Sequence, residues 1–186
     1  MQRKRRVAQL RPGFSLSLTV LQNFDRTLIT RSIRRNTPAC VDSKIHHNSL
    51  INNILAKIEG NLAGADDALM LDDRGFVAET NATHLFFVHG ERVSTSRLVA
   101  CPEGVTRSVV LEICAAEGIE HQETDLSLTE VYRADERFCT GTMGELSPVT
   151  VIDGRTIGTG TLGPMTRRLS GLFSQVVARE AEPVLA

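Results

Sequence analysis

The chain has 186 residues, of which 41% are hydrophobic and 23% are charged. A chain of this length and apolar content can bury the core of one ordinary domain, so disorder of the whole chain is excluded. The formal net charge of -1 excludes an overall field that would recruit nucleic acid or an anionic membrane. Basic residues still gather near the start, where Met1 to Arg6 reads MQRKRR. We interpret this stretch as a solvated terminus rather than a basic patch or a transit-like arm.

Membrane insertion, secretion and metal binding are not indicated by the sequence. No run reaches the roughly 18 apolar residues of a membrane span, and no signal-peptide pattern is present, so we predict a cytoplasmic protein. The four cysteines lack CxxC spacing, and the five histidines offer no HxxxH pair. We therefore predict buried thiols and no metal site.

The first predicted elements are strands and one helix. Short apolar runs at 14–21 and 27–30 favour strands. A helix follows, with Asn48 as its N-cap and Gly60 as its stop. Its amphipathic pattern comes from apolar positions at helical spacing, namely Leu50, Ile51, Ile54, Leu55 and Ile58.

The middle of the chain predicts a hairpin, two strands and a second helix. The runs at 68–71 and 76–79 flank a DDRG turn, and the runs at 84–88 and 92–95 favour two more strands. A helix begins after Gly104, with Thr106 near its cap, and stops at Gly118. Its inner face carries Val109, Val110, Ile113 and Cys114.

The last third predicts two strands around a loop, and then a helix. The strands are 137–140 and 148–152, and the loop between them contains GTMGE. Pro164 begins the last helix, whose inner stripe is Met165, Leu169, Leu172, Phe173, Val176 and Val177. The predicted fold class is a mixed α/β (α+β) domain.

Lysine is the first residue type that points to chemistry. Only Lys4, Lys44 and Lys57 are lysines among the 21 basic residues. Lys4 belongs to the basic start, and Lys57 lies near the end of the first predicted helix, where a cation complements the helix dipole. Lys44 instead precedes that helix, in a junction of the kind from which side chains often enter sites. A surface lysine is the alternative for Lys44.

Two hydroxyl-bearing turns are able to hold an anion. The helix start at Gly104-Val105-Thr106 offers free N–H groups and the positive end of the helix dipole. The second turn spans residues 140–144 and reads TGTMG. Together with Lys44 and the strand-end carboxylate of Glu79, these turns meet the requirements of a pyridoxal phosphate site. A solvated strand end for Glu79 and a turn-forming role for Thr142 are the structural alternatives.

In this order the motifs resemble those of the fold-type IV pyridoxal-phosphate enzymes, or class IV aminotransferases, from about Arg31 to Phe173. The carriers are Lys44 with NSLINNILA at 48–56, DDALMLD at 66–72, GFVAE at 75–79, GVTR at 104–107, TGT at 140–142, PV at 148–149 and IDG at 152–154. The resemblance implies the larger C-terminal domain of that architecture, which has a mixed sheet or pseudo-barrel with packed helices.

The resemblance also implies residue roles and a cofactor, pyridoxal 5'-phosphate. Lys44 would form the Schiff base and move protons, and Glu79 would pair with the pyridine nitrogen. Val105, Thr106 and Thr142 would hold the phosphate. Backbone donors at Met143 and Gly144 would face the substrate carboxylate.

The sequence departs from the family at several positions. His84 stands where the family usually has asparagine, and Ser49 stands where branched-chain enzymes often have tyrosine. Directly before the turn at Gly104-Val105-Thr106, the family usually has an apolar residue followed by proline, and this chain has Pro102 and Glu103. We expect residues 1–38 to be a basic segment and the remnant of the small domain, 39–180 to be the cofactor-binding domain, and 181–186 to be a tail. The arginines at 31, 34 and 35 match the domain junction, so they are not assigned to phosphate.

The resemblance predicts a branched-chain-type aminotransferase that acts on a small amino acid and a 2-oxo acid, and a homodimer. An aminodeoxychorismate lyase-type enzyme and a non-catalytic truncated relative remain as alternatives. Nucleic-acid binding through the basic start is a more remote one, because the chain has one tyrosine and no tryptophan for base stacking. A transaminase is separated from a lyase by the addition of a keto acid acceptor.

Overall fold

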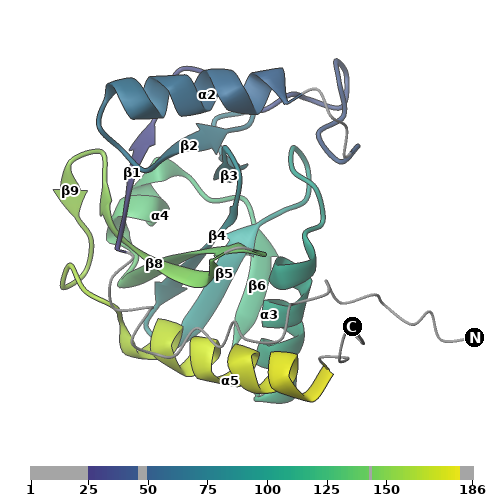
Figure 1. Cartoon of the computed structure of the whole chain (residues 1–186), viewed down its shortest axis with the longest axis vertical. Helices are drawn as coiled ribbons and strands as arrows, with labels where there is room; N and C mark the ends of the chain where they lie inside the picture. Colours follow the sequence, from purple (N-terminus) through teal and green to yellow (C-terminus); the bar gives the residue numbers. More distant parts are fainter. Residues whose placement is uncertain (1–24, 46–49, 143, 181–186) are drawn as a thin grey trace, which may run out of the picture.

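The computed structural model describes residues 25–45, 50–142 and 144–180. Within them lie nine strands and four helices (Figure 1). The expected strand at 14–21, the expected N-cap Asn48 and the site residue Met143 lie outside the described residues. The strands are β1 (Arg26–Thr30), β2 (Asp67–Leu71), β3 (Val77–Thr80), β4 (His84–His89), β5 (Arg92–Ser96), β6 (His121–Thr124), β7 (Glu136–Gly141), β8 (Glu145–Ile152) and β9 (Arg155–Thr156). The helices are α2 (Ile51–Leu62), α3 (Val105–Ala116), α4 (Leu128–Arg133) and α5 (Pro164–Glu180).

The strands form one mixed sheet in the order β3-β2-β1-β8-β7-β4-β5-β6, with β9 paired to β8. β1 runs parallel to both β2 and β8, and β5 runs parallel to β6, while the remaining pairs are antiparallel. The sheet curls, because β3 at one end of this order returns to β5 near the other end. The Ser96 hydroxyl donates a hydrogen bond to the Ala78 carbonyl over 2.5 Å. The curl makes the sheet an incomplete barrel.

Two large cores lie on the two faces of the curled sheet. The inner core includes Leu28, Leu85 and Phe87, and α4 covers it through Val131. The outer core joins the sheet to α3 and α5 around Phe86 and Phe138, whose rings stack with centroids 5.0 Å apart. The predicted inner faces of α3 and α5 both pack into this outer core. The mixed α/β fold class is therefore confirmed.

The helix α2 forms as predicted but ends and faces differently. It continues through Gly60 to Leu62, so Gly60 is not its stop. Its buried residues are Ala56 and Gly60, which pack on β2, whereas the predicted apolar stripe is exposed. The narrow gap between Gly60 and the backbone of Ala68 explains why this face of α2 turns toward β2. A Cβ built on Gly60 would lie 3.4 Å from the Ala68 nitrogen. Only a face of small residues fits this close to β2.

Three elements were not expected from the sequence: β6, α4 and β9. β6 and β9 are short and largely exposed, so they carry little hydrophobic alternation. α4 has a capping box formed by Ser127 and Glu130. That spacing is visible in the sequence and would have located the helix start. In the described part of the chain, no helix is both long and apolar enough to cross a membrane.

Candidate active site

The carboxylate of Glu79 is the buried centre of the site. Glu79 lies on β3 and is 4% exposed. Its Oε1 accepts from the Arg35 Nη2 atom over 2.6 Å, and its Oε2 lies 3.7 Å from the His84 Nε2 atom. Burial raises the pKa of Glu79 to about 7, and the charge of Arg35 opposes this rise. The carboxyl group therefore gains or loses its proton near neutral pH.

Arg35 holds Glu79 and connects it to the surrounding segments. This arginine is 6% exposed, and its Nε donates to the Ala100 carbonyl over 3.2 Å. Its Nη1 donates to Asn53 Oδ1 over 2.5 Å, and Asn53 in turn donates to the Asn81 carbonyl over 2.7 Å. A buried carboxylate needs such a partner, but sequence reasoning did not select Arg35. The sequence offers eighteen arginines and no local pattern that identifies the one facing Glu79.

Lys44 lies in the turn before α2 and is exposed. The preceding residue, Ser43, is buried and donates from its hydroxyl to the Asn36 carbonyl over 2.7 Å. Asn36 follows Arg35 directly in the chain. The hydrogen bond therefore joins the Lys44 turn to the segment of Arg35, the residue that pairs with Glu79. Lys57, in contrast, contacts the Asp66 carbonyl and lies 3.6 Å from Asp67 Oδ1, so its role is structural.

The start of α3 supplies free backbone donors. Gly104 is the N-cap residue, no side chain caps the helix, and the first turn carries no acidic residue. The N–H groups of Val105 and Thr106 are thus available to an anion at the positive end of the helix dipole. Val105 is exposed and Thr106 is half-buried. Thr106 lies inside the helix rather than at its cap.

His84, at the start of β4, lies beside this helix start. The Pro102 carbonyl is 2.8 Å from His84 Nε2, and the ring packs against Gly104. Burial lowers the pKa of His84 to about 4, so the imidazole is neutral at pH 7. The sequence showed His84 only as a departure from the family pattern.

The second predicted turn follows β7, the strand beside β4. His84 pairs with Thr140 across β4 and β7, and a Cβ built on Gly141 would lie 3.1 Å from the Thr83 side chain. Thr142 is exposed, and Gly144 is half-buried with its carbonyl accepting from the Ser147 hydroxyl over 3.0 Å. Both anion-capable turns therefore adjoin the beginning of β4, where His84 lies beside Glu79.

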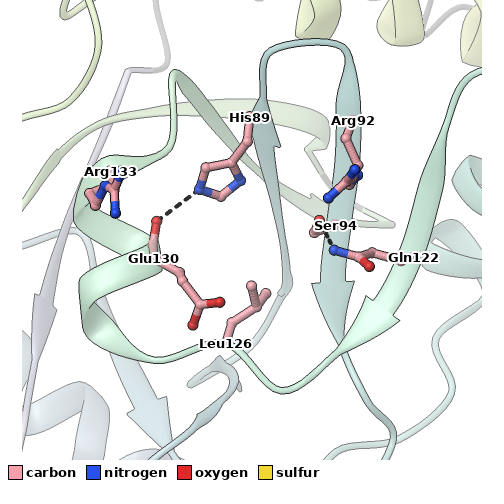
Figure 2. Close-up of a pocket in the computed structure, with 7 residues that line it drawn as sticks. All are labelled: His89, Arg92, Ser94, Gln122, Leu126, Glu130 and Arg133. Atoms are coloured by element: carbon pink, nitrogen blue, oxygen red, sulfur yellow. Dashed lines mark hydrogen bonds between the residues drawn. The ribbon is translucent and has the colours of Figure 1, made fainter.

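A cavity of about 330 Å³ lies elsewhere, between α4 and the strands β4 to β6 (Figure 2). Figure 2 shows His89 bonded to the Glu130 backbone, and Gln122 bonded to Ser94. Its lining residues are His89, Arg92, Ser94, Gln122, Leu126, Glu130 and Arg133. None of the predicted site residues is among them. The candidate site thus rests on the chemistry of its side chains and not on this cavity.

Comparisons with known proteins agree with the resemblance found in the sequence. Residues 14–152 match the family model of amino-transferase class IV. The branched-chain-amino-acid aminotransferase-like protein 2 of Arabidopsis thaliana is 52% identical over 157 residues, which cover 84% of this chain and 28% of that protein. A putative branched-chain-amino-acid aminotransferase of Methanocaldococcus jannaschii is 38% identical, over 80% of this chain and 52% of that protein.

A solved structure shows the same fold. The T.th. branched-chain amino acid aminotransferase with pyridoxamine 5'-phosphate superposes with a TM-score of 0.81 and 37% sequence identity. The match covers 86% of this chain and 54% of that one. The chain thus spans from about a quarter to about half of the length of these relatives.

Proposed function

The chain belongs to the class IV aminotransferase family, and from that premise we propose that it is a pyridoxal-phosphate-dependent aminotransferase of the branched-chain amino acid type. It transfers an amino group between an amino acid and a 2-oxo acid. The observation that carries the proposal is the buried Glu79 carboxylate, held by Arg35 and placed near an uncapped helix start.

The residues at the site fit pyridoxal 5'-phosphate. The cofactor carries a phosphate at one end and a basic pyridine nitrogen at the other, and it acts as an electron sink for the carbanion formed at the substrate Cα. The uncapped N-terminus of α3 fits the phosphate. Glu79 fits the pyridine nitrogen, because a cationic ring beside it would stabilise its ionised form.

Each predicted residue has a distinct task. Lys44 would hold the cofactor through its side-chain amine, and the same amine would take or return the proton at the substrate Cα. Glu79 would pair with the pyridine nitrogen and favour its protonated form. The backbone N–H groups of Val105 and Thr106, with the hydroxyl of Thr142, bind the phosphate. Backbone donors at Gly144, and at Met143 outside the described residues, would bind the substrate carboxylate.

The test is a spectrum of the purified chain with added pyridoxal phosphate, before and after borohydride reduction. We expect an absorbance band that borohydride removes, and mass mapping should place the reduced adduct on Lys44. Lys44→Ala should abolish the band. Lys57→Ala is the matched control, since Lys57 is bound to Asp66 and Asp67. Equal loss in both variants would contradict the assignment of Lys44.

The spectrum also separates the alternative functions. Adding a branched-chain amino acid and then a 2-oxo acid should convert the cofactor to its amine form and back, which a lyase would not do. A folded chain that gives no band would indicate a non-catalytic relative. The chain spans only part of the length of its relatives. The assay therefore tests what this chain does by itself.

The assembly, boundaries and location remain parts of the same proposal. We infer a homodimer, supported by the exposed apolar face of α2. The division at about residue 38, with the cofactor-binding domain at 39–180, follows the family pattern. A cytoplasmic location is supported by Cys40, Cys101, Cys114 and Cys139, which are all free thiols.

A further inference from the structure

We propose that His84 is a positioning residue that fixes the Pro102–Gly104 turn, and with it the phosphate-binding start of α3, relative to Glu79. The inference rests on the proposed function and deepens it. Neither the family comparison nor the predicted roles assign a task to this position.

The first support is steric. The His84 ring lies against the Cα of Gly104, since a Cβ built on Gly104 would be 2.5 Å from Cε1 and 2.8 Å from Nδ1 of the ring. Gly104 has φ 65° and is the last residue before the free N–H groups of Val105 and Thr106. The ring therefore limits how far this turn can shift toward β4.

The second support is the hydrogen bond to Pro102. A carbonyl can only accept, so His84 Nε2 carries the proton and donates it over 2.8 Å. A proline supplies no backbone N–H, and the His84 bond fixes its carbonyl to β4. The turn is thus held by contact at Gly104 and by a bond at Pro102.

The third support is the location of His84 among the other groups of the site. Its Nε2 lies 3.7 Å from Glu79 Oε2, which is beyond hydrogen-bond distance. Its cross-strand partner Thr140 begins the second turn, and the Thr140 hydroxyl is buried without a hydrogen-bond partner in the described residues. The His84 ring therefore lies beside the carboxylate and contacts the first anion-capable turn, and the His84 backbone pairs with the first residue of the second turn. A shift of this ring would change the spacing between the two ends of the cofactor site.

The experiment compares pyridoxal 5'-phosphate with pyridoxal, which lacks the phosphate. Dissociation constants for both aldehydes, measured by absorbance on the full chain, give the affinity ratio that the phosphate contributes. We expect His84→Ala to lower this ratio about tenfold, which corresponds to one lost hydrogen bond. His84→Gln should keep the ratio within about threefold of the wild-type value, because its amide can donate to the same carbonyl.

The controls separate positioning from general damage. His121→Ala changes an exposed histidine on β6 and should leave the ratio unchanged. If His84→Ala does not fold by circular dichroism, His84→Leu replaces it, since leucine fills part of the ring volume and donates no hydrogen bond to Pro102. An unchanged ratio, or an equal loss for both aldehydes, would overturn the role of His84. A wild-type chain that binds neither aldehyde would overturn the proposed function as well.

Discussion

At the residue scale, Glu79 and His84 have pKa values displaced in opposite directions by burial. The pKa of Glu79 is raised from 4.5 to about 7, so between these values the folded chain holds a proton that the unfolded chain has lost. This contribution to the free energy of unfolding is present below pH 4.5 and is lost as the pH rises to about 7. The pKa of His84 is lowered from 6.5 to about 4, so its contribution is present above pH 6.5 and is lost as the pH falls.

The opposite pKa shifts of Glu79 and His84 predict how the stability of the Glu79→Gln variant depends on pH. Relative to the wild type, its free energy of unfolding should rise with pH between 5 and 7, by up to about 1.4 kcal/mol per pH unit. Urea unfolding at three pH values measures the difference. His84→Gln is the internal control, because its difference should change with the opposite sign below pH 6.5. If the difference in free energy of unfolding between Glu79→Gln and the wild type does not change between pH 5 and 7, Glu79 is ionised throughout this range.

At the element scale, the two glycines at the ends of α3 offer a matched comparison. Gly104 and Gly118 have φ values of 65° and 63°. A Cβ on Gly118 meets nothing within 4 Å, whereas one on Gly104 meets the His84 ring. Gly118→Ala therefore costs only backbone strain, about 1 kcal/mol, and Gly104→Ala should cost about 1–3 kcal/mol more.

Chemical denaturation of both variants tests the packing between α3 and β4. In a His84→Ala background the additional cost of Gly104→Ala should disappear, because the clashing ring is gone. The remaining cost should then equal that of Gly118→Ala. Equal costs for the two glycines in the wild-type background would mean that the ring moves away freely and does not hold the turn.

Most elements of the fold were predictable, because their patterns are local. The β2–β3 hairpin, the helix start at Gly104 and the inner faces of α3 and α5 all follow from short-range spacing. The partners of Glu79 were not predictable. Arg35 reaches it across 44 positions of sequence. The outward orientation of α2 was also missed, since periodicity defines an apolar face but not what that face contacts.

At the scale of the whole molecule, the apolar face of α2 departs from an ordinary domain surface in the described part of the chain. Seen in Figure 1, α2 and α5 lie on opposite sides of the sheet. Large apolar side chains on and just before α2 are exposed, and Ile51 is 58% and Leu62 is 84% accessible. The exposed members are Val41, Ile45, Leu50, Ile51, Ile54, Leu55, Ile58 and Leu62. A contiguous apolar surface of this kind marks an association site.

We expect this face to hold two copies of the chain together. The double variant Ile54→Glu and Ile58→Glu places like charges one helical turn apart on the exposed face. Light scattering after size exclusion should show the mass falling from two chains to one. The variants leave the buried contacts of Ala56 and Gly60 with β2 in place, so circular dichroism should stay unchanged.

A change on α5 provides the control for the association of two copies. Gln175→Glu adds a charge at an exposed position on the opposite side of the sheet, and it should leave the mass at two chains. If both the α2 double variant and Gln175→Glu lost the association of two copies, the cause would be a general effect of charge. Added salt would then restore the association. If the α2 variant keeps the mass of two chains, another surface joins the copies. The apolar face of α2 would then have to be covered by something other than a second copy.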